Sequence, residues 1–221
     1  MGAHVHVQAV VFDLDGLLLD SEQVWDEIRE QLARERGGTW SDTAQKDMMG
    51  MSSPEWSRYM HERVGLQESP DEIDAEVVRR LQARYAEELP LLPGAVEAVH
   101  RLAARWPLGL ATSSNRPVID TVLEAAELTP FFAATVSSEE VARGKPAPDV
   151  YVEAARRLDV DPRRAAAIED SHNGIRSARA AGMRVVAIPN PHFPPGAALD
   201  DADVVLSSLD ELTPERVSPP S

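Results

Sequence analysis

The sequence predicts an α/β protein in which a Rossmann-like, doubly wound parallel sheet carries an inserted all-helical cap domain. Two observations support this fold class. Short apolar runs alternate with amphipathic helical patterns in the second half of the chain, as they do where helices connect parallel strands. The first apolar run is also separated from the second by a segment much too long for a single connecting helix. We therefore expect a helical insertion between the first two strands.

The predicted strands are short runs rich in Val, Ile, Leu and Ala, a composition typical of strands that are buried on both faces. They comprise residues 9–12, 108–111, 165–168 and 185–188. Helical patterns separate the later runs, and the first two of these patterns have Pro near the first turn, where its missing N–H is tolerated. These helices are expected at residues 117–128, 148–158 and 174–181.

The segment between the first two strands has helical periodicity throughout. The expected helices comprise residues 22–36, 41–48, 54–64 and 70–87, with linkers at 17–20 and 89–94. We interpret residues 20–88 as a cap domain and residues 1–19 and 89–221 as the core domain. The alternative is that these helices extend the core without forming a separate unit. The tail, residues 214–221, is expected to be frayed.

Composition and charge argue against several classes of function. The chain is 43% hydrophobic and 27% charged, as folded proteins are, and has no apolar run of membrane-spanning length. Its lack of cysteine excludes disulfides, thiolate zinc sites and cysteine nucleophiles. The net charge of -15 argues against nucleic acids and anionic membranes as partners. The N-terminal stretch lacks the basic flank of a secretory signal, so we expect a cytoplasmic protein that is a monomer or a weak dimer.

Polar side chains follow three of the predicted strands at the point where each strand ends. They are Asp13 with Asp15, Thr112 with Ser113, and Glu169 with Asp170. In an open parallel sheet, ligands bind in the crevice outside the carboxyl ends of the strands. We therefore expect these three segments to form one site.

The pair formed by Asp13 and Asp15 is preceded by a buried strand and followed by Gly16, which allows an abrupt turn away from the sheet. Opposite Glu169 and Asp170, this pair would form an oxygen-rich pocket suited to Mg²⁺. Without a cation, the same charges would repel an anionic substrate. Taken alone, the second acidic pair could equally cap a helix.

The residues Thr112 and Ser113 lie between a predicted strand and a predicted helix, so they are suited to hold a phosphate at a helix N-terminus, although helix capping is the alternative.

Lys145 is one of only two lysines, and the flanking Gly144 and Pro146 restrict the backbone around it. We interpret Lys145 as a fixed positive charge directed at a phosphate and a carboxylate.

The motifs FDLDG, LATSSN, GKPAPD and IEDSHNG occur in this order and resemble the four motifs of the haloacid dehalogenase (HAD) superfamily. The helical insertion resembles the first cap type of its β-phosphoglucomutase-like branch. Residues 20–26 and 91–94 look most like those of 2-deoxyglucose-6-phosphate and hexitol-phosphate phosphatases. The resemblance implies a Mg²⁺-dependent phosphatase that hydrolyses small phosphate monoesters, such as sugar or sugar-alcohol phosphates, through a phosphoryl-aspartate.

The resemblance also implies a role for each motif residue. Asp13 would be the nucleophile and Asp15 the general acid and base. The phosphoryl group would be bound by Thr112, the Ser113 backbone and Lys145, and Mg²⁺ by Asp170, the Asp13 carboxylate and the Asp15 carbonyl, with Glu169 as a direct or water-bridged helper. The candidates for substrate selection are Trp25, Asn115 and Asn173.

Four other functions fit the sequence less well. A dehalogenase would not need Asp15, and a phosphonate hydrolase needs a cap lysine, whereas Lys46 lies in a pattern typical of an exposed helix. A β-phosphoglucomutase-type mutase is the nearest alternative, but it has histidine where this chain has Trp25 and arginine where it has Ser53. A non-catalytic phospho-ligand sensor would not need the complete set of acid, lysine and metal-binding residues.

Overall fold

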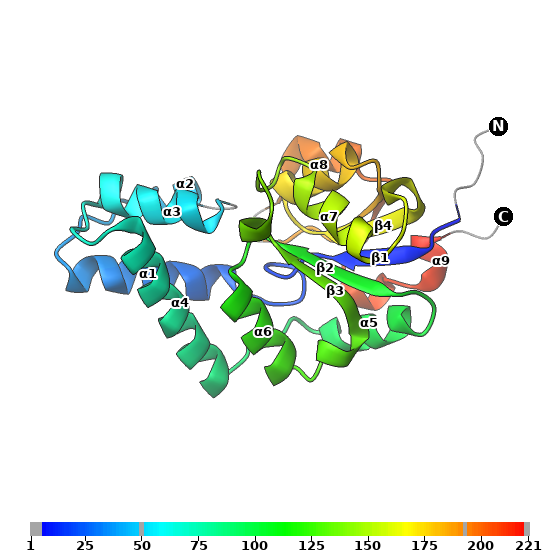
Figure 1. Ribbon diagram of the computed structural model, residues 1–221, viewed down its shortest axis with the longest axis horizontal. Helices are drawn as coiled ribbons and strands as arrows, with labels where there is room; N and C mark the ends of the chain where they lie inside the picture. Colours follow the sequence, from blue (N-terminus) through cyan, green and yellow to red (C-terminus); the bar gives the residue numbers. More distant parts are fainter. Residues whose placement is uncertain (1–5, 49–50, 192–193, 219–221) are drawn as a thin grey trace.

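The computed structural model describes residues 6–48, 51–191 and 194–218, and is built around a parallel sheet in the order β3-β2-β1-β4-β5-β6 (Figure 1). The central strand is β1, whose Val11 pairs with Gly109 of β2 and Ala167 of β4. The strands are β1 (Ala9–Phe12), β2 (Leu108–Thr112), β3 (Phe132–Ser137), β4 (Ala165–Glu169), β5 (Arg184–Ala187) and β6 (Val204–Val205). The predicted parallel α/β sheet is confirmed.

Two strands, β3 and β6, are absent from the sequence prediction, whereas the four predicted strands agree with the structure to within one residue at each end. β3 lies at one edge of the sheet, where Ala133 is exposed and Thr135 is half-buried. β6, at the other edge, has only two residues. Edge strands contact the core on fewer sides, so their sequences lack the continuous apolar run by which the inner strands are found.

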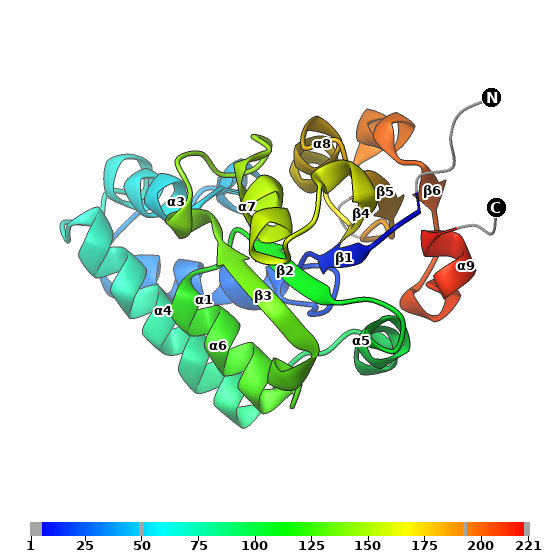
Figure 2. The ribbon, with the colours of Figure 1, turned by 45° about the vertical axis from the view of Figure 1, so that its right-hand side comes forward.

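Helices cover both faces of the sheet (Figure 2). Alternate residues of each strand point to opposite faces, so Val10 and Phe12 belong to one buried cluster and Val11 to the other. The first cluster includes side chains of α5 (Ala95–Ala103), α6 (Arg116–Ala125) and α9 (Pro214–Val217), and the second those of α7 (Asp149–Arg157) and α8 (His172–Ala180). Each fully buried aliphatic side chain contributes about 1.5–3 kcal/mol to this packing.

The insertion after β1 is helical, as predicted, and lies beyond the carboxyl edge of the sheet, at the left of Figure 1. Its elements are α1 (Glu22–Glu35), α2 (Ala44–Met48), α3 (Ser53–Tyr59), a π-helical turn (Met60–Val64) and α4 (Pro70–Glu87). Capping boxes that begin at Ser52 and Ser69 start α3 and α4, and each helix has Pro in its first turn. α4 packs against α1 and α3, and also against α6 of the core. The boundaries of a separate cap domain stay a prediction.

The two segments that join the insertion to the core run side by side. Leu19 forms an antiparallel bridge with Leu91. The Asp20 N–H donates to the Pro90 carbonyl at 2.8 Å, and the Leu92 N–H donates to the Leu18 carbonyl at 2.9 Å. The expected linkers at 17–20 and 89–94 are therefore hydrogen-bonded to each other and form one paired connection.

The C-terminal segment differs from the sequence prediction. Residues 214–217 form α9, and Val217 is fully buried in the core cluster, so the expected fraying is wrong for these residues. The Arg101 guanidinium holds the preceding turn by donating to the carbonyls of Leu209 and Leu212 at 3.2 and 2.9 Å. Residues 219–221 lie outside the described residues.

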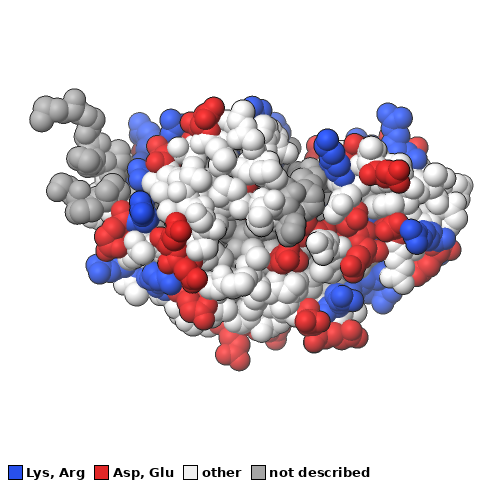
Figure 3. Space-filling view, turned by 180° about the vertical axis from the view of Figure 1, so that it is seen from behind, with Lys and Arg blue, Asp and Glu red and all other residues white. Residues whose placement is uncertain are grey.

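Acidic and basic side chains are interspersed on the face drawn in Figure 3. In the described part of this face, the cations are dispersed among acidic side chains and form no large positive patch (Figure 3). Binding of an anionic substrate therefore depends on cations placed locally at a site. Among the described helices, none is both long and apolar enough to cross a membrane.

Candidate active site

Three strand ends and one loop meet at the carboxyl edge of the sheet. Asp13 follows β1, Thr112 ends β2 and Asp170 follows β4, and β1 lies between β2 and β4. Together with Ser113 and with Lys145 from the loop before α7, they line a cavity of ≈ 470 Å³. The segments that the sequence analysis expects to converge therefore lie around one cavity.

Lys145 is held between two buried carboxylates. Its Nζ donates to Asp13 Oδ1 at 2.7 Å and to Glu169 Oε1 at 2.6 Å, and the Lys145 side chain is only 4% exposed. The Tyr151 hydroxyl also donates to Glu169 Oε1, at 2.7 Å, and the Tyr151 ring centroid lies 5.1 Å from Nζ. Lys145 is thus fixed against the candidate nucleophile.

Burial sets the charge states of this group. Burial raises the pKa of Asp13 to about 8, because the opposing effect of Lys145 is smaller and Glu169 adds repulsion. Burial also raises the pKa of Asp170 well above its ordinary value, and the neighbouring Glu169 and Asp13 add to this effect. For Lys145, burial acts to lower the pKa, but the two carboxylates together outweigh it, so the net pKa is raised and the ammonium stays charged.

Three carboxylates could hold a cation here. Asp13, Glu169 and Asp170 each place an oxygen within 4.8 Å of the others. Asp170 Oδ1 is buried and has no hydrogen-bond partner among the described residues. An all-oxygen donor set with an orphaned carboxylate oxygen fits a hard divalent cation such as Mg²⁺.

The two oxygens of Glu169 are already engaged by the protein. Oε1 accepts from Lys145 and Tyr151. Oε2 accepts from the N–H groups of Asp170 and Ser171 at 3.1 and 3.2 Å, and from the Ser171 hydroxyl at 3.1 Å. This arrangement leaves Asp13 and Asp170 as the carboxylates free to bind a cation directly, with Glu169 as the residue that holds Lys145.

Two motif glycines make room for these carboxylates. Gly16 has φ 78°, and a Cβ there would lie 2.2 Å from Asp170 Oδ2. A Cβ at Gly174, in the first turn of α8, would lie 1.8 Å from Glu169 Oε1. A side chain at either position would displace a carboxylate of this cluster.

Asp15 accepts four hydrogen bonds. Its Oδ1 accepts from the Ser21 hydroxyl at 2.7 Å and from Trp25 Nε1 at 3.1 Å. Its Oδ2 accepts from the hydroxyls of Thr112 and Ser114 at 3.3 and 2.6 Å. Two donors come from the start of the insertion, one from the last residue of β2 and one from the loop after it, so the candidate general acid and base is held by both parts of the molecule.

Neither Ser21 nor Ser114 is predicted from the sequence to bind Asp15. Ser21 precedes α1, where a serine normally caps the helix, but it makes no capping hydrogen bond, and its hydroxyl is used by Asp15 instead. The only local signal for this role is its place between an acidic motif and a helix.

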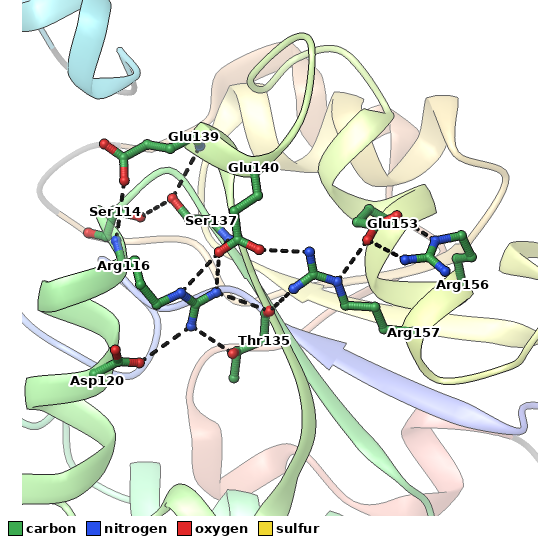
Figure 4. A network of polar contacts seen from close by, with 10 residues as sticks. All are labelled: Ser114, Arg116, Asp120, Thr135, Ser137, Glu139, Glu140, Glu153, Arg156 and Arg157. Atoms are coloured by element: carbon green, nitrogen blue, oxygen red, sulfur yellow. Dashed lines mark hydrogen bonds and ion pairs between the residues drawn. The ribbon is translucent and has the colours of Figure 1, made fainter.

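The loop after β2 is fixed from the side of β3 (Figure 4). The Ser137 hydroxyl donates to the Ser114 carbonyl at 2.7 Å, and the Ser114 N–H donates to Thr112 Oγ1 at 3.0 Å. Beside them, the Arg116 guanidinium contacts Glu140 and donates to Thr135 Oγ1 at 2.8 Å. These contacts hold rigidly the segment expected to bind phosphate.

The Asn115 amide joins the insertion to the core. Its oxygen accepts from the Ser53 hydroxyl of α3 at 2.8 Å. Its nitrogen donates to both carboxylate oxygens of Asp74 in α4, at 3.1 and 3.0 Å, and to Glu139 at 2.8 Å. Asn115 is 2% exposed, so its polar groups are spent on these contacts rather than presented to a substrate.

The insertion contributes its own side chains to the site. Lys46 of α2 is exposed, as expected, yet it lines the ≈ 470 Å³ cavity. Asn173, from α8 outside the insertion, lines the same cavity. Trp25 lines a smaller adjacent pocket of ≈ 70 Å³, which also includes Arg29. Arg29 is not among the site residues predicted from the sequence.

Comparisons with known proteins agree with this geometry. The chain matches the family model of haloacid dehalogenase-like hydrolases over residues 7–182. It is 35% identical to hexitol phosphatase B of Escherichia coli strain K12 over 210 residues, which cover 94% of this chain and 95% of that protein.

Solved structures give the same picture. CbbY from Rhodobacter sphaeroides, in complex with phosphate, superposes with a TM-score of 0.82 at 28% identity, covering 93% of this chain and 96% of that one. β-Phosphoglucomutase from Clostridium difficile has the same fold, with a TM-score of 0.76 at 22% identity, covering 95% of this chain and 94% of that one.

Proposed function

Because the chain belongs to the haloacid dehalogenase-like hydrolases, in their β-phosphoglucomutase-like branch, we propose that it releases phosphate from sugar or sugar-alcohol phosphates, with Mg²⁺ and through a phosphoryl-Asp13 intermediate. The family and its phosphatase relatives make the chain a phosphoric monoester hydrolase of small phosphates. The metal, the covalent intermediate and the leaving group are what the proposal adds.

The observation that carries the proposal is the pairing of Asp13 with Lys145, at 2.7 Å, beside the unpartnered Oδ1 of Asp170. A carboxylate that attacks a phosphate dianion must overcome repulsion between like charges, and Lys145 supplies a fixed positive charge at that point. A divalent cation bound by Asp13 and Asp170 would supply further positive charge for the same purpose.

Asp13 and Asp15 would divide the chemistry between them. In the first step, an Asp13 oxygen bonds to phosphorus while the bond from phosphorus to the substrate oxygen breaks, and Asp15 gives that oxygen a proton. In the second step, Asp15 takes a proton from water, the water oxygen bonds to phosphorus, and Asp13 is released. Thr112 and the Ser113 backbone lie on the wall of the same cavity, where they would hold the phosphoryl oxygens.

The hydrogen bonds on Asp15 tie its position to the insertion. Four donors hold the Asp15 carboxyl group in place, two from the insertion and two from β2 and the loop after it. Since Ser21 and Trp25 belong to the insertion, a shift of α1 would remove two of the donors. Such a shift requires that residues 20–88 form a cap domain that moves about the paired linkers, which is part of the proposal.

The mutase alternative has less support. Ser53, which stands where the mutase has an arginine, is buried and donates to Asn115. Trp25 stands where the mutase has a histidine and donates to Asp15 through its indole N–H. An indole N–H is only a donor, so it cannot accept a proton as a histidine ring can. The mutase alternative is tested by incubating the enzyme with β-glucose 1-phosphate and a trace of the bisphosphate, and by measuring glucose 6-phosphate and inorganic phosphate together. If glucose 6-phosphate accumulates faster than inorganic phosphate, the mutase is the better assignment.

The main test is phosphate release from sorbitol 6-phosphate, glucose 6-phosphate, 2-deoxyglucose 6-phosphate and a nucleoside monophosphate, with Mg²⁺ and after EDTA treatment. We expect turnover of the sugar and polyol esters to exceed that of the nucleotide, and to stop after EDTA. Full activity in EDTA would contradict the metal, and a preference for the nucleotide would contradict the substrate class. No turnover of p-nitrophenyl phosphate would favour the non-catalytic sensor.

A further inference from the structure

We propose that Arg29 selects the substrate by donating hydrogen bonds to the hydroxyl groups of an uncharged, polyhydroxylated leaving group. The proposal rests on the proposed phosphatase function, because it concerns the part of the substrate that departs as an alcohol. It assigns a specificity-determining residue in α1 and excludes substrates with a second phosphate on the leaving group.

The Arg29 guanidinium lies between two tryptophan rings. Its central carbon is 4.7 Å from the ring centroid of Trp25 in α1 and 4.7 Å from that of Trp56 in α3. The two indole rings are themselves in contact, with centroids 6.0 Å apart and an angle of 63° between their planes. Both tryptophans are buried, so the guanidinium is held in a fixed orientation by aromatic faces.

No acceptor on the described part of the chain satisfies this guanidinium. Its Nε is buried and has no hydrogen-bond partner there. Neither Glu22 nor Asp26, the carboxylates that act on it most strongly, forms a hydrogen bond or an ion pair with it. Burial lowers the pKa of Arg29 to about 10, so it stays charged at neutral pH. A buried donor without an acceptor is costly, and contacts with aromatic rings offset only part of that cost.

The unsatisfied guanidinium lines a pocket that leads from the candidate general acid. Arg29, Glu22 and Asp15 line the same pocket of ≈ 70 Å³, together with Trp25 and Trp56. Asp15 also lines the larger cavity that contains Asp13 and Lys145. A phosphate near Lys145 would therefore have its ester oxygen near Asp15 and the rest of the leaving group directed towards Arg29.

The charge of this pocket favours hydroxyl groups over a second phosphate. One guanidinium faces the carboxyl groups of Glu22 and Asp15, so the surroundings offer no excess positive charge to an anion. A hydroxyl group both donates and accepts, so a polyol can accept from Arg29 and donate to Glu22 at the same time. The apolar walls formed by Trp25 and Trp56 suit the C–H faces of a sugar or polyol.

The test compares Arg29→Met with wild type on two substrates. We expect kcat/KM for sorbitol 6-phosphate to fall about 10- to 100-fold, the loss typical of hydrogen bonds from a charged donor. For p-nitrophenyl phosphate, whose leaving group has no sugar hydroxyls, we expect a change of less than about threefold. The matched control is Arg34→Met in the same helix, since Arg34 is 74% exposed and paired with Glu30; it should leave both substrates unchanged.

Equal losses on both substrates would overturn the proposal, because they would indicate a structural role. If Arg29→Met does not fold, the proposal is tested by comparing kcat/KM of the wild-type enzyme on different esters. We expect sorbitol 6-phosphate to be hydrolysed at least about tenfold more efficiently than ethyl phosphate or fructose 1,6-bisphosphate; preference for either of the latter overturns the proposal. Absence of turnover on every ester would instead overturn the proposed phosphatase function.

Discussion

Asp13 occupies a position that disfavours its own charge. It is 5% exposed, and burial raises its pKa to about 8 even though Lys145 donates to it at 2.7 Å. The repulsion from Glu169 adds to the effect. A cation bound beside Asp13 would favour its ionised form, which is the form that attacks phosphorus.

At the residue scale, we predict that Asp13→Asn abolishes turnover and leaves the fold intact. The amide keeps the volume of the side chain but removes the attacking anion. Steady-state phosphate release should fall at least about a thousandfold, while circular dichroism and thermal unfolding stay close to wild type. A variant that retains more activity than this would contradict covalent catalysis by Asp13.

At the scale of elements, the start of α8 is packed tightly against the end of β4. The Ser171 hydroxyl accepts from the Gly174 N–H at 3.1 Å and caps the helix, and it also donates to Glu169 Oε2. Glu169 in turn holds Lys145. The helix terminus therefore positions the candidate catalytic lysine through one carboxylate.

We predict that Gly174→Ala disturbs this arrangement, because the new Cβ would overlap the Glu169 carboxylate at 1.8 Å. The free energy of unfolding should fall by about 1–3 kcal/mol or more, as measured by chemical denaturation, and phosphatase activity should fall with it. Gly144→Ala is the control for stability, since a Cβ there meets its nearest heavy atom at 3.5 Å. Equal stability of the two variants would contradict the explanation.

The contact of α3 and α4 with the core depends on pH through Asp74. Burial raises the pKa of Asp74 to about 6, although the hydrogen bond from Asn115 acts to lower it. Because the pKa in the folded state is above its ordinary value, ionisation of Asp74 costs stability as the pH rises towards and through about 6. The amide of Asn115 limits this cost by donating to the ionised form.

We predict that Asn115→Ala lowers the free energy of unfolding by about 1–3 kcal/mol, and by more at about pH 7 than at about pH 5. At the higher pH, Asp74 is ionised and loses its donor; at the lower pH, it is protonated and loses less. Denaturant titrations at the two pH values measure the difference. Ser53→Ala is the control, because it removes a hydrogen bond between uncharged groups, and its deficit should not depend on pH.

At the scale of the whole molecule, the carboxylate cluster links stability to pH and to divalent cations. The folded-state pKa of Asp13 is raised to about 8, so without a cation the protein loses stability as the pH rises from about 4 to about 8. A cation that binds the ionised cluster opposes this loss, because it binds the folded state more tightly than the unfolded chain.

We predict that Mg²⁺ raises the thermal unfolding temperature of the wild-type protein, and more so at about pH 8 than at about pH 5. At a concentration of about 100 Kd the stabilisation should be about 2.7 kcal/mol. Asp170→Asn should lose most of the shift, whereas Asp159→Asn, an exposed position at which asparagine tolerates the observed φ of 57°, should keep it. An undiminished shift in Asp170→Asn would remove this residue from the cation site.

The sequence by itself determined the inner strands, the helical insertion and the order of the four motifs. These features are local: β1 is a continuous apolar run, and α4 begins with a proline and with a capping box formed by a serine and a glutamate. Because Asp13 and Asp15 follow such a strand directly, their place at the edge of the sheet could be predicted as well.

Only the tertiary structure decided which partners the polar side chains have. Asn115 bonds to Ser53 and Asp74, which are 62 and 41 residues away in the chain. Trp25 and Trp56 meet around Arg29 only because α1 and α3 are folded together. The reason is physical: residue pattern reports backbone preference and burial over a few neighbours, whereas hydrogen bonds and buried charges depend on the distances that packing sets between distant segments.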